Sequence, residues 1–193
     1  MYCSNVNGRS KDHAKTSSCA YLRSIVLASP VINTHRWIAD CTAYRRQLPK
    51  DLQAVLDKHE AEGAVLSDAY QDAVMVFYKR HLCRADPWPW ELERAFELFN
   101  YGLYQAMWGP AEFTSNGILK DYDGDRRLGE IVVPTLYTCG EFDEATPAAC
   151  QEFAEMTPNA RVEVAEGCSH TAHLENQEGY LKVVETFLSE VQS

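Results

Sequence analysis

The sequence has no excess of positive charge, which narrows the range of partners. Its 193 residues contain 18 lysines and arginines against 28 aspartates and glutamates, for a formal net charge of −10. Binding to nucleic-acid phosphates requires clustered Lys and Arg side chains. We therefore expect no nucleic-acid surface. The acidic balance suits a cationic ligand, although solvated acidic side chains alone also produce such a balance.

Long hydrophobic runs are also missing. The longest one near the start, Ile25–Ile32, is interrupted by Ser29 and Pro30. It is much shorter than the roughly 20 residues needed to span a bilayer. The polar N-terminus lacks the apolar segment of a signal peptide. We expect neither a membrane span nor secretion.

Paired cysteine motifs are absent as well. The seven cysteines are odd in number and include no C-x-x-C pair; they are Cys3, Cys19, Cys41, Cys83, Cys139, Cys150 and Cys168. Such a scatter is typical of reduced thiols rather than of a disulfide framework. We expect a cytoplasmic protein that needs no cofactor and no metal.

What the sequence does contain is enough apolar material for one domain, or for one core with a large insertion. Hydrophobic residues make up 46% of the chain and include four tryptophans. Residues Met1–Ala20 are poor in hydrophobic side chains, and we expect them to form a disordered or unrelated leader.

Three short segments have the character of buried strands, rich in β-branched and aromatic residues: Arg23–Ser29, Thr135–Cys139 and Arg161–Ala165. They alternate with helical patterns, which predicts a parallel sheet and an α/β fold. A helix beginning at Thr146-Pro147 and a final helix at Gln177–Val191 fit this alternation.

Residues 34–117 have mainly helical periodicity. Thr34 is the expected N-cap of the first helix, Gly63 the stop of the second, and Ser67 the N-cap of the third. The expected helices after the first are Asp51–Glu62, Ser67–Leu82 and Glu91–Met107. This pattern predicts a helical lid inserted into a core formed by residues 21–33 and 118–193.

The candidate site lies at the ends of two strands. Gly140 opens a turn that presents Asp143 and Glu144, and the third strand leads into Gly167-Cys-Ser-His170. A carboxylate and an imidazole at neighbouring strand ends can meet, and the carboxylate then orients the imidazole as a general base. The alternative is an ordinary turn beside a solvated histidine.

These residues resemble a known family, the proline iminopeptidases, which are serine aminopeptidases of the α/β-hydrolase superfamily. The resemblance covers roughly Tyr21 to Val191 and is carried by Ile25–Pro30, Trp37–Asp40, Trp108–Phe113, Pro134–Pro147 and Ser169-His170. It implies an incomplete α/β-hydrolase fold and the removal of an N-terminal proline from peptides.

The resemblance also implies roles for single residues. Asp143 matches the triad acid and His170 the triad base, while Glu112 and Glu144 match the acids that hold the substrate's free amino group. A carboxylate about 4 Å from an ammonium attracts it by roughly 4 kcal/mol at an effective dielectric constant near 20. Such a pair favours an unblocked N-terminus over an internal peptide bond.

One part of the family pattern is missing. The nucleophile of these hydrolases lies in a G-x-S-x-G turn, and neither Gly8-Arg-Ser10-Lys-Asp12 nor Gly167-Cys-Ser169-His-Thr171 has that form and context. No loop that would supply oxyanion donors is present either. We therefore expect the C-terminal portion of such an enzyme, inactive without a serine from elsewhere, with strand Arg23–Ser29 exposed as an edge for homo-oligomer formation.

Three alternatives remain open from the sequence. The chain could bind amines without catalysis, or be part of another α/β-hydrolase such as an esterase or amidase. A third alternative is a metal site formed by Cys168, His170, His173 and Glu175, although their spacing matches no known zinc pattern.

Overall fold

A three-stranded parallel sheet is the centre of the fold. The computed structural model describes residues 22–192, so the expected leader lies outside the described residues. Its strands are β1 (Ile25–Ala28), β2 (Thr135–Gly140) and β3 (Ala160–Ala165), in the order β1-β2-β3. Thr135 of β2 is paired with Ile25 on one side and Ala160 on the other. The predicted parallel sheet is confirmed.

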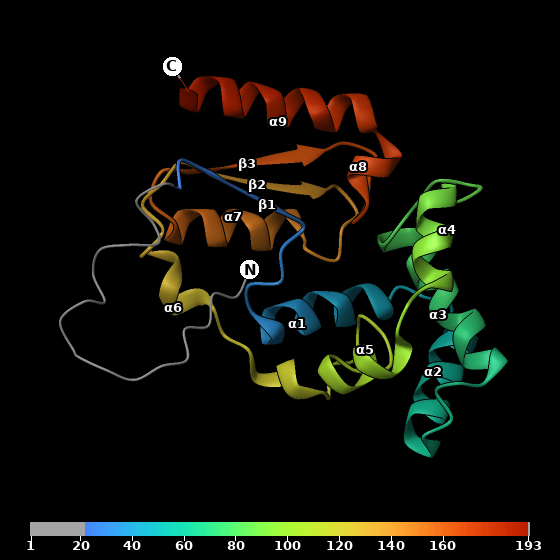
Figure 1. Ribbon diagram of the computed structural model, residues 1–193. Helices are drawn as coiled ribbons and strands as arrows, with labels where there is room; N and C mark the ends of the chain where they lie inside the picture. Colours follow the sequence, from blue (N-terminus) through green and yellow to red (C-terminus); the bar gives the residue numbers. More distant parts are fainter. Residues whose placement is uncertain (1–21, 193) are drawn as a thin grey trace.

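Two helices cover opposite faces of this sheet, α7 (Pro147–Met156) and α9 (Gln177–Gln192) (Figure 1). Helix α7 begins as the sequence predicts, because the Thr146 side chain accepts a hydrogen bond from the Ala149 amide and Pro147 occupies the first turn. Both helices bury a phenylalanine, Phe153 from α7 and Phe187 from α9.

The helices between β1 and β2 lie on the side of α7 that faces away from the sheet, and several of them extend beyond the C-terminal ends of the strands (Figure 1). They are α1 (Thr34–Arg45), α2 (Lys50–Glu62), α3 (Asp68–His81), α4 (Trp90–Glu97) and α5 (Tyr101–Met107). Shorter helical turns follow at Ile118–Asp121 (η1), Asp125–Leu128 (α6) and Ala172–Glu175 (α8). The predicted stop at Gly63, in the left-handed conformation, and the predicted cap at Ser67 are confirmed.

Two details of the sequence prediction are wrong. The N-cap of α1 is Asn33, whose side chain accepts from the Arg36 amide, while the Thr34 hydroxyl donates to the carbonyl of Leu119. The expected helix at Glu91–Met107 is two helices, because the Asn100 side chain accepts from the Leu103 amide and starts α5 afresh. Asparagine side chains compete with helix continuation in this way.

One cluster of buried hydrophobic side chains joins the helical segment to the sheet. It runs from Trp37 and Phe77 in the helices to Tyr137 in β2 and Phe153 in α7. The helices are thus packed against the same core as the strands, which holds them over the C-terminal ends of the strands, where the candidate site lies.

Strand β1 is an outer strand of the described sheet. Its residues Ile25, Val26 and Leu27 are only partly buried, whereas every residue of the central strand β2 is buried. The predicted exposed apolar edge is therefore present within residues 22–192. Whether it mediates association stays a prediction.

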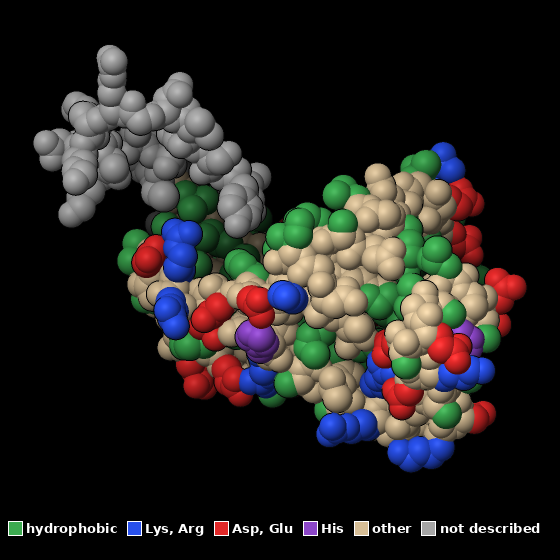
Figure 2. Space-filling view, turned by 90° about the horizontal axis from the view of Figure 1, so that it is seen from below, with side chains coloured by type: hydrophobic (Ala, Val, Ile, Leu, Met, Phe, Trp, Pro, Cys, Tyr) green, Lys and Arg blue, Asp and Glu red, His purple; other side chains and the backbone are tan. Residues whose placement is uncertain are grey.

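The surface seen from below carries charges of both signs (Figure 2). Lys and Arg side chains on this face lie beside Asp and Glu side chains instead of forming one continuous basic patch. Across the described part of the chain, every helix is too short or too polar to cross a membrane.

Candidate functional site

The carboxylate of Asp143 and the imidazole of His170 meet at the C-terminal ends of β2 and β3. The Asp143 Oδ1 atom lies 2.9 Å from His170 Nδ1, which confirms the proximity predicted from the sequence. The loop after β3 that carries His170, residues 166–171, is called the base loop. It can pass this closely to β2 because residue 140 is glycine: a Cβ there would collide with the backbone carbonyls of Cys168 and Ser169.

Asp143 is fully buried and both of its oxygens are satisfied. Oδ1 also accepts from the Ala145 amide at 2.8 Å, and Oδ2 accepts from the Gly140 amide at 3.1 Å. The hydroxyl of Ser29 donates to Oδ2 at 2.6 Å. These donors fix the carboxylate in one orientation.

Ser29 was not identified as a site residue from the sequence. It follows β1 with φ of 45°, a left-handed conformation that is rare for serine. Its hydroxyl also lies 3.1 Å from the His170 carbonyl oxygen. A strained backbone that delivers a side chain to a buried carboxylate is typical of functional sites.

The His170 ring is held from one side and open on the other. Trp37 packs edge-on against it with 5.8 Å between the ring centroids, and 29% of the side chain is exposed. Burial disfavours the imidazolium, but the hydrogen bond to Asp143 and the charges of Asp143, Glu112 and Glu175 outweigh it and raise the pKa of His170. Within residues 22–192, Nε2 has no hydrogen-bond partner and is the atom available for a reacting group.

Glu175 shapes the loop that carries His170. Its carboxylate accepts from the Ser169 amide at 3.1 Å, from the Ser169 hydroxyl at 2.6 Å and from the Thr171 hydroxyl at 3.2 Å. Ser169 is thereby committed to a structural role beside His170, as expected from its position next to the proposed base.

Glu112 is close enough to the same imidazole for the two charges to influence each other. The Trp37 indole N–H donates to the Glu112 carbonyl oxygen at 3.0 Å, and the Tyr104 hydroxyl donates to Glu112 Oε1 at 2.7 Å. Burial raises the pKa of Glu112, while the Tyr104 hydrogen bond and the charge of His170 partly oppose the rise. Tyr104 is a second site residue that the sequence did not reveal.

Glu144 is buried without any partner. It is fully buried, and neither carboxylate oxygen has a hydrogen bond among the described residues. Burial, followed by the charges of Glu112 and Asp143, raises its pKa well above the ordinary value. A buried polar group without a partner is costly. It therefore requires an explanation, which would be either a proton on the carboxyl or a cation from outside the described chain.

The small cavity next to Glu144 limits how a ligand reaches it. It has a volume of about 10 Å³ and is bordered by side chains such as Ile32, Ala149 and Phe153. Such a volume holds at most about one water molecule. An amine larger than ammonium therefore does not fit into this cavity.

The alternative metal site is not formed. Cys168, His170, His173 and Glu175 do not converge, and across residues 22–192 no three Cys, His, Asp or Glu side chains are arranged as metal ligands.

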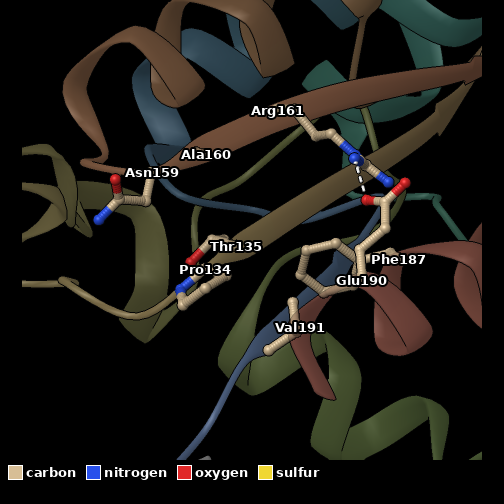
Figure 3. A pocket seen from close by; sticks show the side chains of 8 residues that line it. All are labelled: Pro134, Thr135, Asn159, Ala160, Arg161, Phe187, Glu190 and Val191. Atoms are coloured by element: carbon tan, nitrogen blue, oxygen red, sulfur yellow. Dashed lines mark hydrogen bonds and ion pairs between the residues drawn. The ribbon is translucent and has the colours of Figure 1, made fainter. Parts of the chain in front are cut away.

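A larger hollow of about 490 Å³ lies at the opposite ends of the strands (Figure 3). Thr135 and Ala160, the first residues of β2 and β3, line it together with Phe187 of α9. The Arg161 guanidinium pairs with Glu190 across it at 2.5 Å. It is remote from Asp143 and His170, since parallel strands separate the two ends.

Several solved structures are similar to this chain. The chain superposes on VinJ with a TM-score of 0.84 and 37% identity over 88% of this chain and 58% of that one. It superposes on a proline iminopeptidase from Mycobacterium smegmatis with a TM-score of 0.78 and 35% identity, over 87% and 57%. A thermophilic esterase, at 22% identity and a TM-score of 0.51, shares the fold alone.

Curated relatives agree with the structures. A proline iminopeptidase from Heyndrickxia coagulans is 34% identical over 88% of this chain and 59% of its own length. One from Saccharolobus solfataricus is 32% identical over 90% and 56%. No family model matches the sequence.

The fold is thus an incomplete α/β-hydrolase fold, with three parallel strands, flanking helices and a helical segment over the strand ends. The chain is similar to the C-terminal portion of proline iminopeptidases, and it spans between half and two thirds of the length of the relatives that it matches. The resemblance expected from the sequence is confirmed.

Proposed function

We propose that this chain supplies the acid–base pair and the amine-binding acids of an aminopeptidase that releases an N-terminal proline. His170 acts as the general base, and Asp143 orients it and stabilises its protonated form. Glu112 and Glu144 bind the substrate's ammonium group. The nucleophilic serine and the oxyanion donors come from outside these 193 residues, and residues 34–117 act as the lid.

The contact that carries the catalytic part is the 2.9 Å distance between Asp143 Oδ1 and His170 Nδ1. It leaves Nε2 free to take a proton from a serine hydroxyl. The raised pKa of His170 fits this role, because a base that gains a proton during the reaction is stabilised in its charged form by Asp143.

The amine-binding part is supported by the state of Glu144. This carboxylate is fully buried and lacks a partner in the described chain. A secondary ammonium between Glu144 and Glu112 would satisfy both acids and offset their mutual repulsion. An internal peptide bond carries no such charge, so the pair would select a free N-terminus.

A reconstitution experiment tests the catalytic part. The chain is mixed with a separately produced N-terminal segment of the Heyndrickxia coagulans relative, covering the part that this chain does not match, and the hydrolysis of a proline amide is followed. We expect turnover only in the mixture, with loss of at least about a thousandfold in kcat when His170 is replaced by Ala. A folded, associated mixture without turnover would contradict the proposal.

Calorimetry tests the amine part without any chemistry. Prolinamide should bind the complete 193-residue chain, whereas the N-acetylated compound, which lacks the ammonium, should not. Glu144→Gln and Glu112→Gln should each abolish binding. The control Glu130→Gln, at an exposed acid, should leave it unchanged.

A second function is favoured by the same buried acid. If prolinamide binds but the reconstituted mixture remains inactive, the chain is an amine-binding protein that retains the acid–base pair only as structure.

The five described cysteines are all buried and free, which supports the proposed location in the reducing cytoplasm.

A further inference from the structure

The end of helix α3 contacts both loops that carry the Asp143–His170 pair. His81, the last residue of α3, is 6% exposed. Its Nδ1 atom lies 2.8 Å from the carbonyl oxygen of Phe142, the residue before Asp143. Its own carbonyl oxygen accepts the backbone N–H of His170 at 3.0 Å.

These contacts close a ring of interactions. The ring runs from the His81 side chain to Phe142, through the peptide bond to Asp143, from Asp143 to His170, and from the His170 amide back to the His81 backbone. Phe142 is also tied directly to the base loop, since its N–H donates to the Cys168 carbonyl at 2.9 Å. Within this ring, His81 alone comes from outside the two loops.

We propose that His81 is a positioning residue that sets the geometry of the Asp143–His170 pair and couples it to helix α3. A displacement of α3 relative to the sheet would pull on Phe142 and on His170 together, because His81 holds one with its side chain and the other with its backbone. The catalytic meaning of this coupling rests on the proposed function, while the coupling itself does not.

The surroundings of His81 leave its ring little freedom. The ring stacks on Tyr44 of α1, with centroids 3.9 Å apart and planes 12° apart, and its centroid is 4.9 Å from that of Phe77. The Arg84 guanidinium lies over the Phe142 ring, 4.0 Å from its centroid. Two side chains thus contact Phe142, that of His81, the last residue of α3, and that of Arg84, from the segment just after the helix.

The charge state of His81 fits a donor to Phe142. Burial lowers the pKa of His81, the Phe142 hydrogen bond opposes the fall, and the charges of Arg80 and Arg84 add to it. A neutral imidazole has a single N–H, and the contact with a carbonyl oxygen requires that this hydrogen be on Nδ1. The tautomer of His81 is therefore a direct readout of the contact.

The competing explanation is that His81 is only a packed aromatic ring. Two variants of His81 distinguish these explanations, because each keeps one property of the side chain and removes the other. His81→Phe keeps an aromatic ring against Tyr44 and Phe77 but removes the donor. His81→Asn removes the ring but keeps an N–H group attached to Cγ, the position that Nδ1 occupies in histidine. Phe77→Leu is the control for lost packing, since it leaves the Phe142 hydrogen bond in place.

The measurement is the pH titration of the His170 imidazole by ¹⁵N–¹H NMR in the complete chain. We expect His81→Phe to lower the pKa of His170 and to abolish the downfield signal of its Nδ1 proton. His81→Asn should retain both despite a larger loss of stability, and Phe77→Leu should leave both as in the wild type. In the wild type, the ¹⁵N shifts of His81 should show the Nδ1–H tautomer.

Two results would overturn the proposal. One is an Nε2–H tautomer of His81 in the wild type, which decides the question even if His81→Phe fails to fold. The other is a His170 titration in His81→Phe that matches that of Phe77→Leu. Neither readout needs substrate or turnover, so this inference can fail while the proposed function holds, and the reverse. In a reconstituted active mixture, His81→Phe should reduce kcat by at least about tenfold with KM unchanged.

Discussion

Asp143 and Glu144 are neighbours in sequence and equally buried, yet their surroundings are opposite. Asp143 receives hydrogen bonds from Ser29, two backbone amides and His170, whereas Glu144 has no partner in the described chain. The Asp143 carboxylate thus has its hydrogen-bond partners without any ligand. Glu144 is a buried acid whose partner must come from outside or whose charge must be neutralised by a proton. One turn therefore carries two different carboxylates. Asp143 has its hydrogen-bond partners in place and is called the finished contact, whereas Glu144 has none in the described chain and is called the unfinished contact.

The largest effect should come from removing the finished contact. Asp143→Ala would leave two buried amides, the Ser29 hydroxyl and His170 without their acceptor, and we expect a loss of about 3 to 5 kcal/mol in the free energy of unfolding. Urea unfolding at pH 7 measures it.

Asp121→Ala is the matched control, because that carboxylate is exposed and should change stability by less than about 0.5 kcal/mol. A loss at Asp143 no larger than that at Asp121 would mean that the buried contacts contribute nothing to stability.

Removing the unfinished contact should have the opposite sign. Glu144→Met replaces an unpaired buried acid by an apolar side chain of similar length, and we expect a gain of about 1 to 3 kcal/mol at pH 8. The price of that gain should be the loss of amine binding.

The pH dependence sharpens this prediction. A carboxyl whose folded-state pKa is raised contributes fully to stability below its unfolded-state pKa, near 4.3, and loses this contribution as the pH rises through its folded-state pKa. The advantage of Glu144→Met should therefore be smallest near pH 4 and grow toward pH 8. A variant that is less stable than the wild type at pH 8 would show that Glu144 is paired in solution.

The sequence was sufficient to identify the site residues in the turns after β2 and β3. It was not sufficient to identify the residues that reach the site from other elements. Asp143 and His170 follow strands directly, so alternation of strands and helices was enough to bring them together. The resemblance added Glu112 and Glu144. Ser29 also follows a strand, but its side chain reaches Asp143 through a left-handed backbone that no sequence signal indicates. His81 approaches from α3, and only the packing of that helix decides where its side chain ends.

The helical segment shows the same limit. Its periodicity predicted the extents of α2 and α3 closely, because their caps at Gly63 and Ser67 are local signals. The division between α4 and α5 was missed, since the apolar pattern continues through Phe96, Leu98 and Phe99. A single asparagine side chain, capping α5, outweighs that pattern.

Ser29 provides a smaller perturbation of the finished contact. Ser29→Ala removes one hydrogen bond to a charged carboxylate but keeps a Cβ in the left-handed region, and we expect a loss of about 1.5 to 3 kcal/mol. Ser29→Gly loses the same hydroxyl but is relieved of roughly 1 to 2 kcal/mol of backbone strain. Gly should thus be the more stable of the two variants in thermal and urea unfolding. The reverse order would place the strain elsewhere than at residue 29.

The smallest effect should be the contribution of His170 to the pH dependence of stability. Its folded-state pKa is raised, so the protonated ring stabilises the fold below its unfolded-state pKa, near 6.5, and this contribution disappears as the pH rises through the folded-state pKa. His170→Gln should remove that decline, with the exposed His35→Gln as the matched control. The effect is small because part of the ring faces water, which weakens its attraction to Asp143.

Stability curves measured from pH 5 to 9 should therefore converge for wild type and His170→Gln at the alkaline end of the histidine titration, apart from a constant packing difference. A gap that widens with rising pH would mean that Asp143 does not hold the proton on His170, and would remove the basis for assigning this pair as acid and base.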